Sequence, residues 1–258
     1  MADDRRGFLR KNLGGAAALL SGVAAGAGGM HLYKGAQRFR PGEAKHSYAQ
    51  QGEDLILWNI VSQFLRFHPV TYLDIGAHHP IEGNNTFLFY EKGYRGVLVE
   101  PNPALWEALA AMRPGDSLLR AGIGAGGESE ADYYVISGDG GLNTFSKEMA
   151  DSYAAKTSQR YKIEKVVRLP LLDINQVMLK HWGGAPHVLS VDTEGFELPI
   201  LQSLDFSRLR PNVVCVDTLE FNSRRVRGAI LELMAAKGYD VRGATFVNTI
   251  FVDRRHTG

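Results

Sequence analysis

The chain has 258 residues, which is enough for one large domain or two small ones with a sizeable core. Apolar residues make up 45% of it and charged residues 22%, as in an ordinary globular protein. The formal net charge of +1 gives no electrostatic reason to expect a nucleic-acid partner, and the single cysteine, Cys215, excludes an internal disulfide and a cysteine-rich zinc site.

Residues 1–45 differ from the rest and are interpreted as a leader. The basic string DRRGFLRK resembles a twin-arginine export signal, and it is followed by an uncharged Gly/Ala-rich stretch over 13–30. That stretch is mild and short for a bilayer span, and basic residues flank it on both sides, so its orientation is not settled. A disordered basic leader is the alternative.

After residue 45, apolar segments alternate with segments of helical periodicity. The run HVLSVD is apolar along most of its length, as expected for a strand covered on both faces. Alternating strands and helices predict an α/β fold with a parallel sheet and helices on both faces, over residues 46–258. The predicted strands are 70–75, 95–100, 117–123, 131–136, 166–172, 187–192 and 212–218, the predicted helices are 83–92, 103–112, 173–181, 196–204 and 224–237, and the tail predicts an antiparallel pair.

Acidic residues stand at the ends of four predicted strands. In an open parallel sheet, ligands bind beyond the carboxyl ends of the strands, at the point where the strand order reverses. Buried carboxylates are costly unless they meet cations or hydroxyls, so this edge predicts a polar, hydroxyl-bearing and partly cationic ligand. The acids are Asp74, Glu100, Asp192 with Glu194, and Asp217 with Glu220.

The loop after the first strand, DIGAHHPIEG, favours a nucleoside ligand other than a dinucleotide. Gly76 permits a tight turn, but His78 and Ile81 occupy the second and third glycine positions of the G-x-G-x-x-G pattern. A carboxylate at Asp74 would repel a pyrophosphate and favour the ammonium and sulfonium groups of S-adenosylmethionine. Glu100 can accept both ribose hydroxyls in either kind of site. A turn-capping role for Asp74 is the alternative.

The segment VDTEGFE supplies candidates for acid–base chemistry. Asp192 or Glu194 could take a proton from an attacking hydroxyl, whereas Glu197 fits capping of the following helix. His78 is a further candidate base, although His78 and His79 could simply orient their loop. No metal-binding spacing accompanies the two histidines, so we predict no metal site, and magnesium held by the carboxylates is the alternative.

The loop GDGGLNTFS, over 138–146, is rich in neutral hydrogen-bonding groups. It could clamp the ligand, and we assign that role to Asn143 and Thr144. A plain surface turn is the alternative.

Taken together and in order, these segments resemble the FkbM family of methyltransferases over roughly residues 47–253. Each segment is weak alone, and the ordered set is specific. Much of the family has Asn and Gly in the first loop where this chain has His78 and Pro80, which we interpret as a branch variant. The segments are SYAQQGEDLIL, YLDIGAHHP, NNTFLFYEKGYRGVLVEPNP, GLNTFSKE, LSVDTEGFELPIL and NTIFV.

The resemblance implies a Rossmann-like class I methyltransferase fold, with a mostly parallel seven-stranded sheet and a C-terminal antiparallel strand. It implies methyl transfer from S-adenosylmethionine, usually to an oxygen of a sugar, glycolipid or secondary metabolite. By position, the donor site would comprise Asp74, Gly76, Ala77, His78, Glu100, Asn102, Asn143 and Thr144, and Asp192 and Glu194 would lie near the acceptor.

Two other functions remain as alternatives. A nicotinamide-dependent oxidoreductase would share the fold class, but the missing glycine pattern and Asp74 oppose it. A non-catalytic nucleoside-binding protein could have kept the fold. Export would separate the enzyme from cytosolic donor, so we favour a cytoplasmic or cytoplasmic-membrane-associated location, with membrane association through residues 13–30 and twin-arginine-like export left open.

Overall fold

The computed structural model describes residues 46–137, 140–156, 161–220, 223 and 225–257. The predicted leader over 1–45 lies outside the described residues, as do Gly138 and Asp139 of the predicted 138–146 loop. Within the described ranges, no helix has the length and apolar character that crossing a membrane requires.

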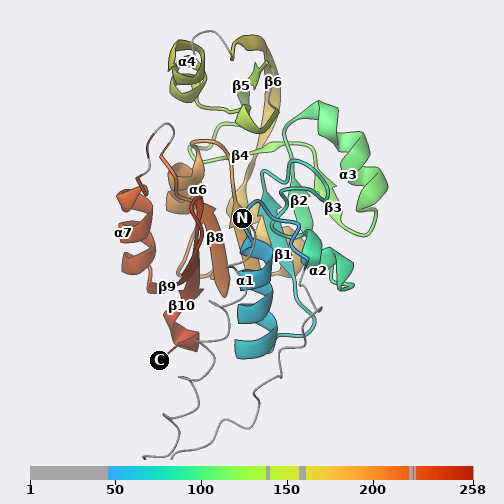
Figure 1. Ribbon diagram of the computed structural model, residues 1–258, viewed down its shortest axis with the longest axis vertical. Helices are drawn as coiled ribbons and strands as arrows, with labels where there is room; N and C mark the ends of the chain where they lie inside the picture. The colour runs from blue at the N-terminus through green and yellow to red at the C-terminus, as the bar shows by residue number, and fades with distance from the viewer. Residues whose placement is uncertain (1–45, 138–139, 157–160, 221–222, 224, 258) are drawn as a thin grey trace, which may run out of the picture. The chain divides into compact units, whose positions relative to one another are not determined.

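A seven-stranded sheet forms the centre of the fold (Figure 1). Its strands are β1 (Tyr72–Ile75), β2 (Val97–Val99), β3 (Ser117–Leu119), β7 (Val188–Val191), β8 (Val213–Asp217), β9 (Tyr239–Ala244) and β10 (Asn248–Asp253). They lie in the order β3-β2-β1-β7-β8-β10-β9. β10 runs in the direction opposite to the other six strands, which are parallel to one another. This confirms the predicted Rossmann-like sheet with its antiparallel C-terminal strand. The chain order reverses between β1 and β7, where a ligand is expected.

Successive side chains of each strand enter two different cores, one on each face of the sheet. Leu73 and Ile75 of β1 face one core, and Tyr72 faces the other. The first core is covered by α5 (Ile174–Trp182), α6 (Glu197–Ser203) and α7 (Gly228–Ala236). The second is covered by α1 (Glu53–Asn59) with its π-helical continuation Ile60–Phe64, α2 (Phe87–Glu91) and α3 (Trp106–Met112). Cys215 is fully buried in the second core.

The predicted strand over 117–123 is wrong, because it divides into two strands of different sheets. β4 (Gly122–Gly124) pairs in parallel with β6 (Ile163–Asp173), which pairs antiparallel with β5 (Glu130–Ile136). With α4 (Lys147–Lys156) these strands form a small module, residues 122–173, which lies at the top of Figure 1 beyond the carboxyl edge of the main sheet. Gly122 permits this departure, since a Cβ there would lie 2.4 Å from the ring of Phe145.

The helix predicted over 83–92 begins later, at Phe87. The preceding residues are used elsewhere: the side chains of Asn84 and Thr86 both donate hydrogen bonds to Asp74. The sequence analysis also missed α1 and α4. α1 is fixed at its start by Asp54, whose carboxylate accepts hydrogen bonds from the Ser47 hydroxyl and the Tyr48 amide.

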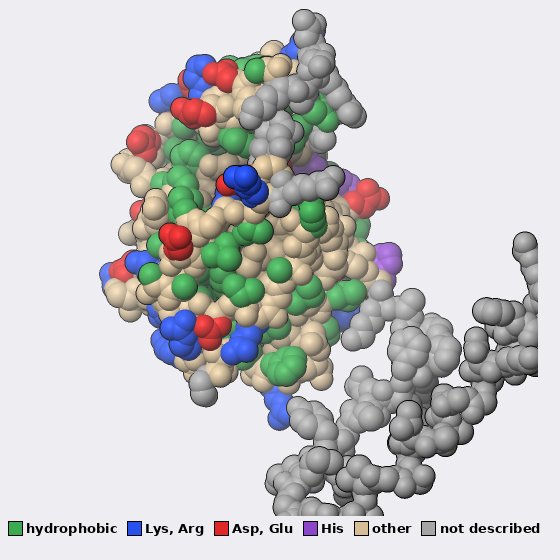
Figure 2. All heavy atoms as spheres, turned by 60° about the vertical axis from the view of Figure 1, so that its left-hand side comes forward, with side chains coloured by type: hydrophobic (Ala, Val, Ile, Leu, Met, Phe, Trp, Pro, Cys, Tyr) green, Lys and Arg blue, Asp and Glu red, His purple; other side chains and the backbone are tan. Residues whose placement is uncertain are grey.

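Charges of both signs are mixed over the surface. On the face shown in Figure 2, Lys and Arg side chains lie singly or beside Asp and Glu, with hydrophobic side chains between them. Ion pairs of the described residues such as Lys147–Asp151 and Arg254–Asp240 belong to this exposed layer. Such exposed pairs contribute little to stability, so the fold depends on its two cores.

We predict that Gly76→Ala lowers the free energy of unfolding by about 3 kcal/mol or more, measured by urea denaturation. Gly76 has a φ of +83°, and a Cβ there would lie 1.7 Å from the backbone oxygen of Asp192. Gly93→Ala is the matched control, because Gly93 has a φ of +90° with nothing within 4 Å. The control should lose only the ~1–2 kcal/mol of left-handed backbone strain. Equal losses in the two variants would contradict the close approach.

Candidate functional site

A cavity of about 340 Å³ opens at the carboxyl ends of β1, β2 and β7. Eight residues selected from the sequence line it: Asp74, Gly76, Ala77, His78, Glu100, Asn143, Asp192 and Glu194. The sequence analysis did not single out Gln50, Ile123, Tyr133, Phe145, Phe196 or Ile200, which also line it. Contacts between distant segments bring these six residues to the cavity. Phe145 could have been found from the sequence, because it directly follows the predicted ligand residues Asn143 and Thr144.

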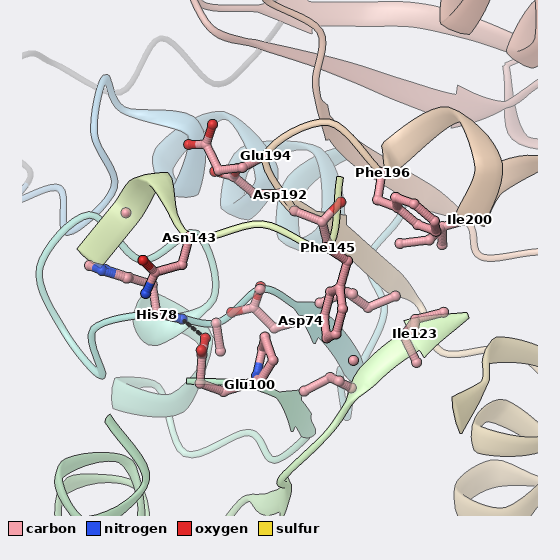
Figure 3. Close-up of a pocket in the computed structure, with 18 of the residues that line it drawn as sticks. Asp74, His78, Glu100, Ile123, Asn143, Phe145, Asp192, Glu194, Phe196 and Ile200 are labelled. Carbon is pink, nitrogen blue, oxygen red and sulfur yellow. Dashed lines mark hydrogen bonds between the residues drawn. The ribbon is translucent and has the colours of Figure 1, made fainter. Parts of the chain in front are cut away.

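The cavity has an apolar side and a polar side. Phe145, Phe196, Ile200 and Ile123 gather on one side, and Figure 3 shows Glu194, Asn143 and His78 on the other. Asp74 and Glu100 lie between the two groups. The cavity can therefore accept a ligand with a flat apolar part and a polar, charged part.

Glu100 follows β2 directly and is only 3% exposed. Its carboxylate accepts hydrogen bonds from the backbone N–H groups of His78 and Asn102, both at 2.7 Å. Burial raises the pKa of Glu100 to about 7, and these two hydrogen bonds oppose the increase. A carboxylate held in this way keeps lone pairs for hydroxyl groups of a ligand.

Asp74 lies at the base of the cavity and takes part in a buried polar network. Its carboxylate accepts hydrogen bonds from the Thr86 hydroxyl at 2.7 Å and the Asn84 amide at 3.3 Å. The guanidinium of Arg113, 1% exposed, donates to both of these residues and forms an ion pair with Asp116. Burial raises the pKa of Asp74, and the positive charge of Arg113 opposes that increase. Asp74 therefore combines a ligand-facing position with a structural role.

His78 and His79 differ in position. His78 has a left-handed φ of +49°, donates its backbone N–H to Glu100, and lines the cavity. The Nδ1 atom of His79 accepts hydrogen bonds from the backbone N–H groups of Ile81 and Glu82. His79 therefore orients the loop, which is one of the two roles considered for it.

The turn between β7 and α6 carries the acids of VDTEGFE. Glu197 lies in the first turn of α6, and its carboxylate accepts hydrogen bonds from the backbone amides of Thr193 and Gly195, which belong to the turn before the helix that it was predicted to cap. Asp192 and Glu194 line the cavity instead. Burial raises the pKa of Glu194 to about 7, and burial together with the charge of Asp217 raises the pKa of Asp192.

Three carboxylates form a cluster beside this turn. Ligand atoms of Asp192, Glu197 and Asp217 lie within 4.8 Å of one another. Arg227 forms an ion pair with Glu197, whose oxygens also bind backbone amides. Arg227 therefore offsets part of the negative charge of these three acids, and the pKa values of Asp192 and Asp217 remain raised.

Two residues predicted to bind the cofactor do not line the cavity. The side chain of Asn102 caps the next helical turn by accepting a hydrogen bond from the Ala104 amide at 3.1 Å. Thr144 is fully buried, and its hydroxyl donates to the backbone oxygen of Glu194 at 2.8 Å. Asn143 does line the cavity, but its Oδ1 accepts a hydrogen bond from Ile136, so it also anchors the loop to β5.

The family model described as Methyltransferase FkbM domain matches residues 74–241, more than half of the chain. No curated protein sequence matches the chain. Similar solved structures include a TehB-like SAM-dependent methyltransferase from Corynebacterium glutamicum, at 11% identity over 79% of this chain and 88% of that chain with a TM-score of 0.41. They also include 1,6-didemethyltoxoflavin-N1-methyltransferase from Burkholderia thailandensis, with bound 1,6-didemethyltoxoflavin and S-adenosylhomocysteine, at 12% identity over 78% and 75% of the two chains with a TM-score of 0.40. Precorrin-6y C5,15-methyltransferase from Geobacter metallireducens matches at 12% identity over 78% and 86%, with a TM-score of 0.41.

The raised carboxyl pKa values predict how stability depends on pH. Burial raises the pKa of Glu100 and the pKa of Glu194 to about 7 in the folded protein, against an ordinary glutamate pKa of 4.5. Between these values the folded protein holds protons that the unfolded chain has released, so stability falls as the pH rises through this window. For Glu100 alone the fall is ~3 kcal/mol.

Urea denaturation of the wild type and of Glu100→Gln, at intervals from about pH 4.5 to 7.5, tests this prediction. The variant lacks the titrating group, so its stability should fall less steeply with pH even if it is less stable overall. The same slope for both proteins would show that the Glu100 pKa is not raised.

Proposed function

The chain belongs to the FkbM methyltransferase family, and from that premise we propose that it transfers a methyl group from S-adenosylmethionine to a hydroxyl oxygen of a sugar or a related small metabolite. The observation that carries the donor part of this proposal is the position of Glu100, buried beside a cavity between an apolar wall and the turn at Gly76. The acids at the other end of the cavity support the hydroxyl acceptor.

The residues present fit the methyl donor. Glu100 can accept hydrogen bonds from the two ribose hydroxyls while its own position is fixed by backbone amides. The apolar side, with Ile123, Phe145 and Phe196, suits an adenine ring. Asp74 and the backbone at Gly76, which both line the cavity, suit the charged methionine end.

The donor, when bound, supplies a methyl group already activated by positively charged sulfur. The chain therefore mainly has to align the acceptor and remove its proton. With the donor bound, the methyl–sulfur bond would break as the acceptor oxygen bonds to the methyl carbon, leaving S-adenosylhomocysteine. Positive charge would develop on the acceptor oxygen, and its O–H bond would weaken. Carboxylates at this end of the cavity stabilise that charge, and one of them takes the proton.

We assign to Glu194 the role of the base that accepts the proton of the acceptor hydroxyl. It lines the cavity, and burial sets its pKa at about 7, close to the ideal value for a base at neutral pH. Asp192 lies two residues earlier and adds negative charge to the same end of the cavity. His78, on the same polar side, is the second candidate base.

Calorimetric titration with S-adenosylmethionine, S-adenosylhomocysteine and NAD tests the donor assignment. We predict micromolar-range binding of the two adenosyl-sulfur ligands and none of NAD. Glu100→Ala should weaken that binding at least ~100-fold, because each lost hydrogen bond to a charged group costs ~1.5 kcal/mol or more.

Glu107→Ala is the matched control, since Glu107 is an exposed glutamate of α3 and should leave affinity unchanged. Near-normal affinity in Glu100→Ala would contradict the assignment. Donor binding without methyl transfer to any member of an acceptor panel would favour a non-catalytic binding protein.

We predict that Glu194→Gln lowers the rate of methyl transfer at least ~100-fold and changes donor affinity less than threefold, because the lost group acts on the acceptor proton. Asp192→Asn should act in the same direction with a smaller effect. Transfer of labelled methyl to a panel of sugars measures the rate, and calorimetry measures the affinity. An unchanged rate in both variants would remove them from the catalytic residues.

A further inference from the structure

The turn that carries Glu194 is held by three side chains of the small module. The hydroxyl of Tyr153 in α4 donates to Oε2 of Glu194 at 2.7 Å. The hydroxyl of Thr144 donates to the backbone oxygen of Glu194 at 2.8 Å. A Cβ on Gly195 would lie 2.7 Å from Cγ of Met149, so α4 packs directly on the turn.

The backbone of this turn is strained. Glu194 has a φ of +54°, in the left-handed region that residues with a Cβ rarely adopt. Such a conformation costs about 1–3 kcal/mol and persists only where the surroundings enforce it. The contacts from Thr144 and Met149 provide that constraint, and they fix where the Glu194 side chain starts.

We propose that Tyr153 is a positioning residue for Glu194, whose carboxylate it orients and holds ready to receive the acceptor's proton. The proposal rests on the proposed function, in which Glu194 is the base. The small module then has a definite role, because its Tyr153 orients the carboxylate of Glu194, which follows a strand of the main sheet.

The geometry allows one carboxylate oxygen to be fixed and the other to react. Tyr153 binds Oε2, and Oε1 has no hydrogen-bond partner among the described residues. Tyr153 is fully buried, and burial and the charge of Glu194 raise the pKa of its hydroxyl, so it remains a donor throughout the working pH range. A fixed donor of this kind stabilises the ionised carboxylate, which is the form that accepts a proton.

Other charged groups face Glu194 from the elements packed around it. The acids oppose its ionisation, and Arg227 favours it, as does the hydrogen bond from Tyr153. The charged groups are Asp192 after β7, Glu197 of α6, Asp217 of β8 and Arg227 before α7, and the titratable Tyr133 of β5 also faces Glu194.

Tyr153→Phe removes the hydroxyl and keeps the buried ring. The pKa of Glu194 can be measured without an acceptor by carbon-13 NMR of the full chain labelled at glutamate Cδ, with Glu194→Gln identifying the signal. We expect a pKa of about 7 in the wild type. In Tyr153→Phe we expect it to rise by about one unit, equivalent to ~1.4 kcal/mol. S-adenosylhomocysteine affinity should stay within threefold.

Tyr134→Phe is the control, because Tyr134 packs against the core of the same module and does not bind Glu194. It should leave the Glu194 pKa unchanged. An unchanged pKa in Tyr153→Phe, or an equal rise in Tyr134→Phe, would overturn the proposal. Failure of the wild type to bind S-adenosylhomocysteine would instead contradict the proposed function, whatever the Glu194 titration shows.

A second measurement covers the case in which Tyr153→Phe does not fold, as judged by thermal melting. With tyrosine labelled at Cζ, one signal of the wild type should shift with the same midpoint as Glu194, because its hydroxyl senses that carboxylate. The shift should vanish in Glu194→Gln. Absence of such a signal would overturn the positioning role.

Discussion

The close approach of Gly76 to Asp192 is the constraint on which the site depends. The backbone oxygen of Asp192 lies where a Cβ of residue 76 would be, so β1 and β7 can meet at their carboxyl ends only because that Cβ is missing. The meeting point is also where the chain order of the sheet reverses. The acids at the ends of β1 and β7 are therefore placed relative to one backbone contact, and a small displacement there would move Asp74 and Glu194 together.

That contact creates an electrostatic problem, because it brings several carboxylates into a buried space. The chain solves it differently at the two ends of the cavity. Beside Asp74, a buried guanidinium, Arg113, donates to both of the side chains that bind the carboxylate. Beside Glu194, Arg227 forms its ion pair with Glu197, and the pKa values of Asp192 and Glu194 remain raised. At the first end a neighbouring cation opposes the rise in the carboxyl pKa, and at the second end Glu194, with a pKa of about 7, can exchange a proton near neutral pH.

The local sequence pattern predicted most of the main sheet and the acids at its edge, because the apolar run of a strand and the residue that ends it are adjacent in sequence. It failed where a distant contact decides. The 117–123 segment divides because Phe145 packs on Gly122, and Thr144 supports Glu194 because α4 and β5 fold over the turn. Asn102 looked like a ligand residue and is a helix cap, since the two roles use the same side chain at the same place in sequence.

In the proposed function, the small module holds in place a base whose pKa is about 7, at a turn of the kind that is ordinarily mobile. A turn between a strand and a helix is ordinarily among the less rigid parts of a fold, yet proton transfer demands that the carboxylate stay within hydrogen-bonding distance of its target. The main sheet supplies the acid at the end of β7, and Glu197 binds backbone amides on both sides of the left-handed Glu194. Thr144, Met149 and Tyr153 reach that residue from a separate sheet and helix. In the proposed function, placement of the acid and control of its proton are thereby divided between two parts of the fold.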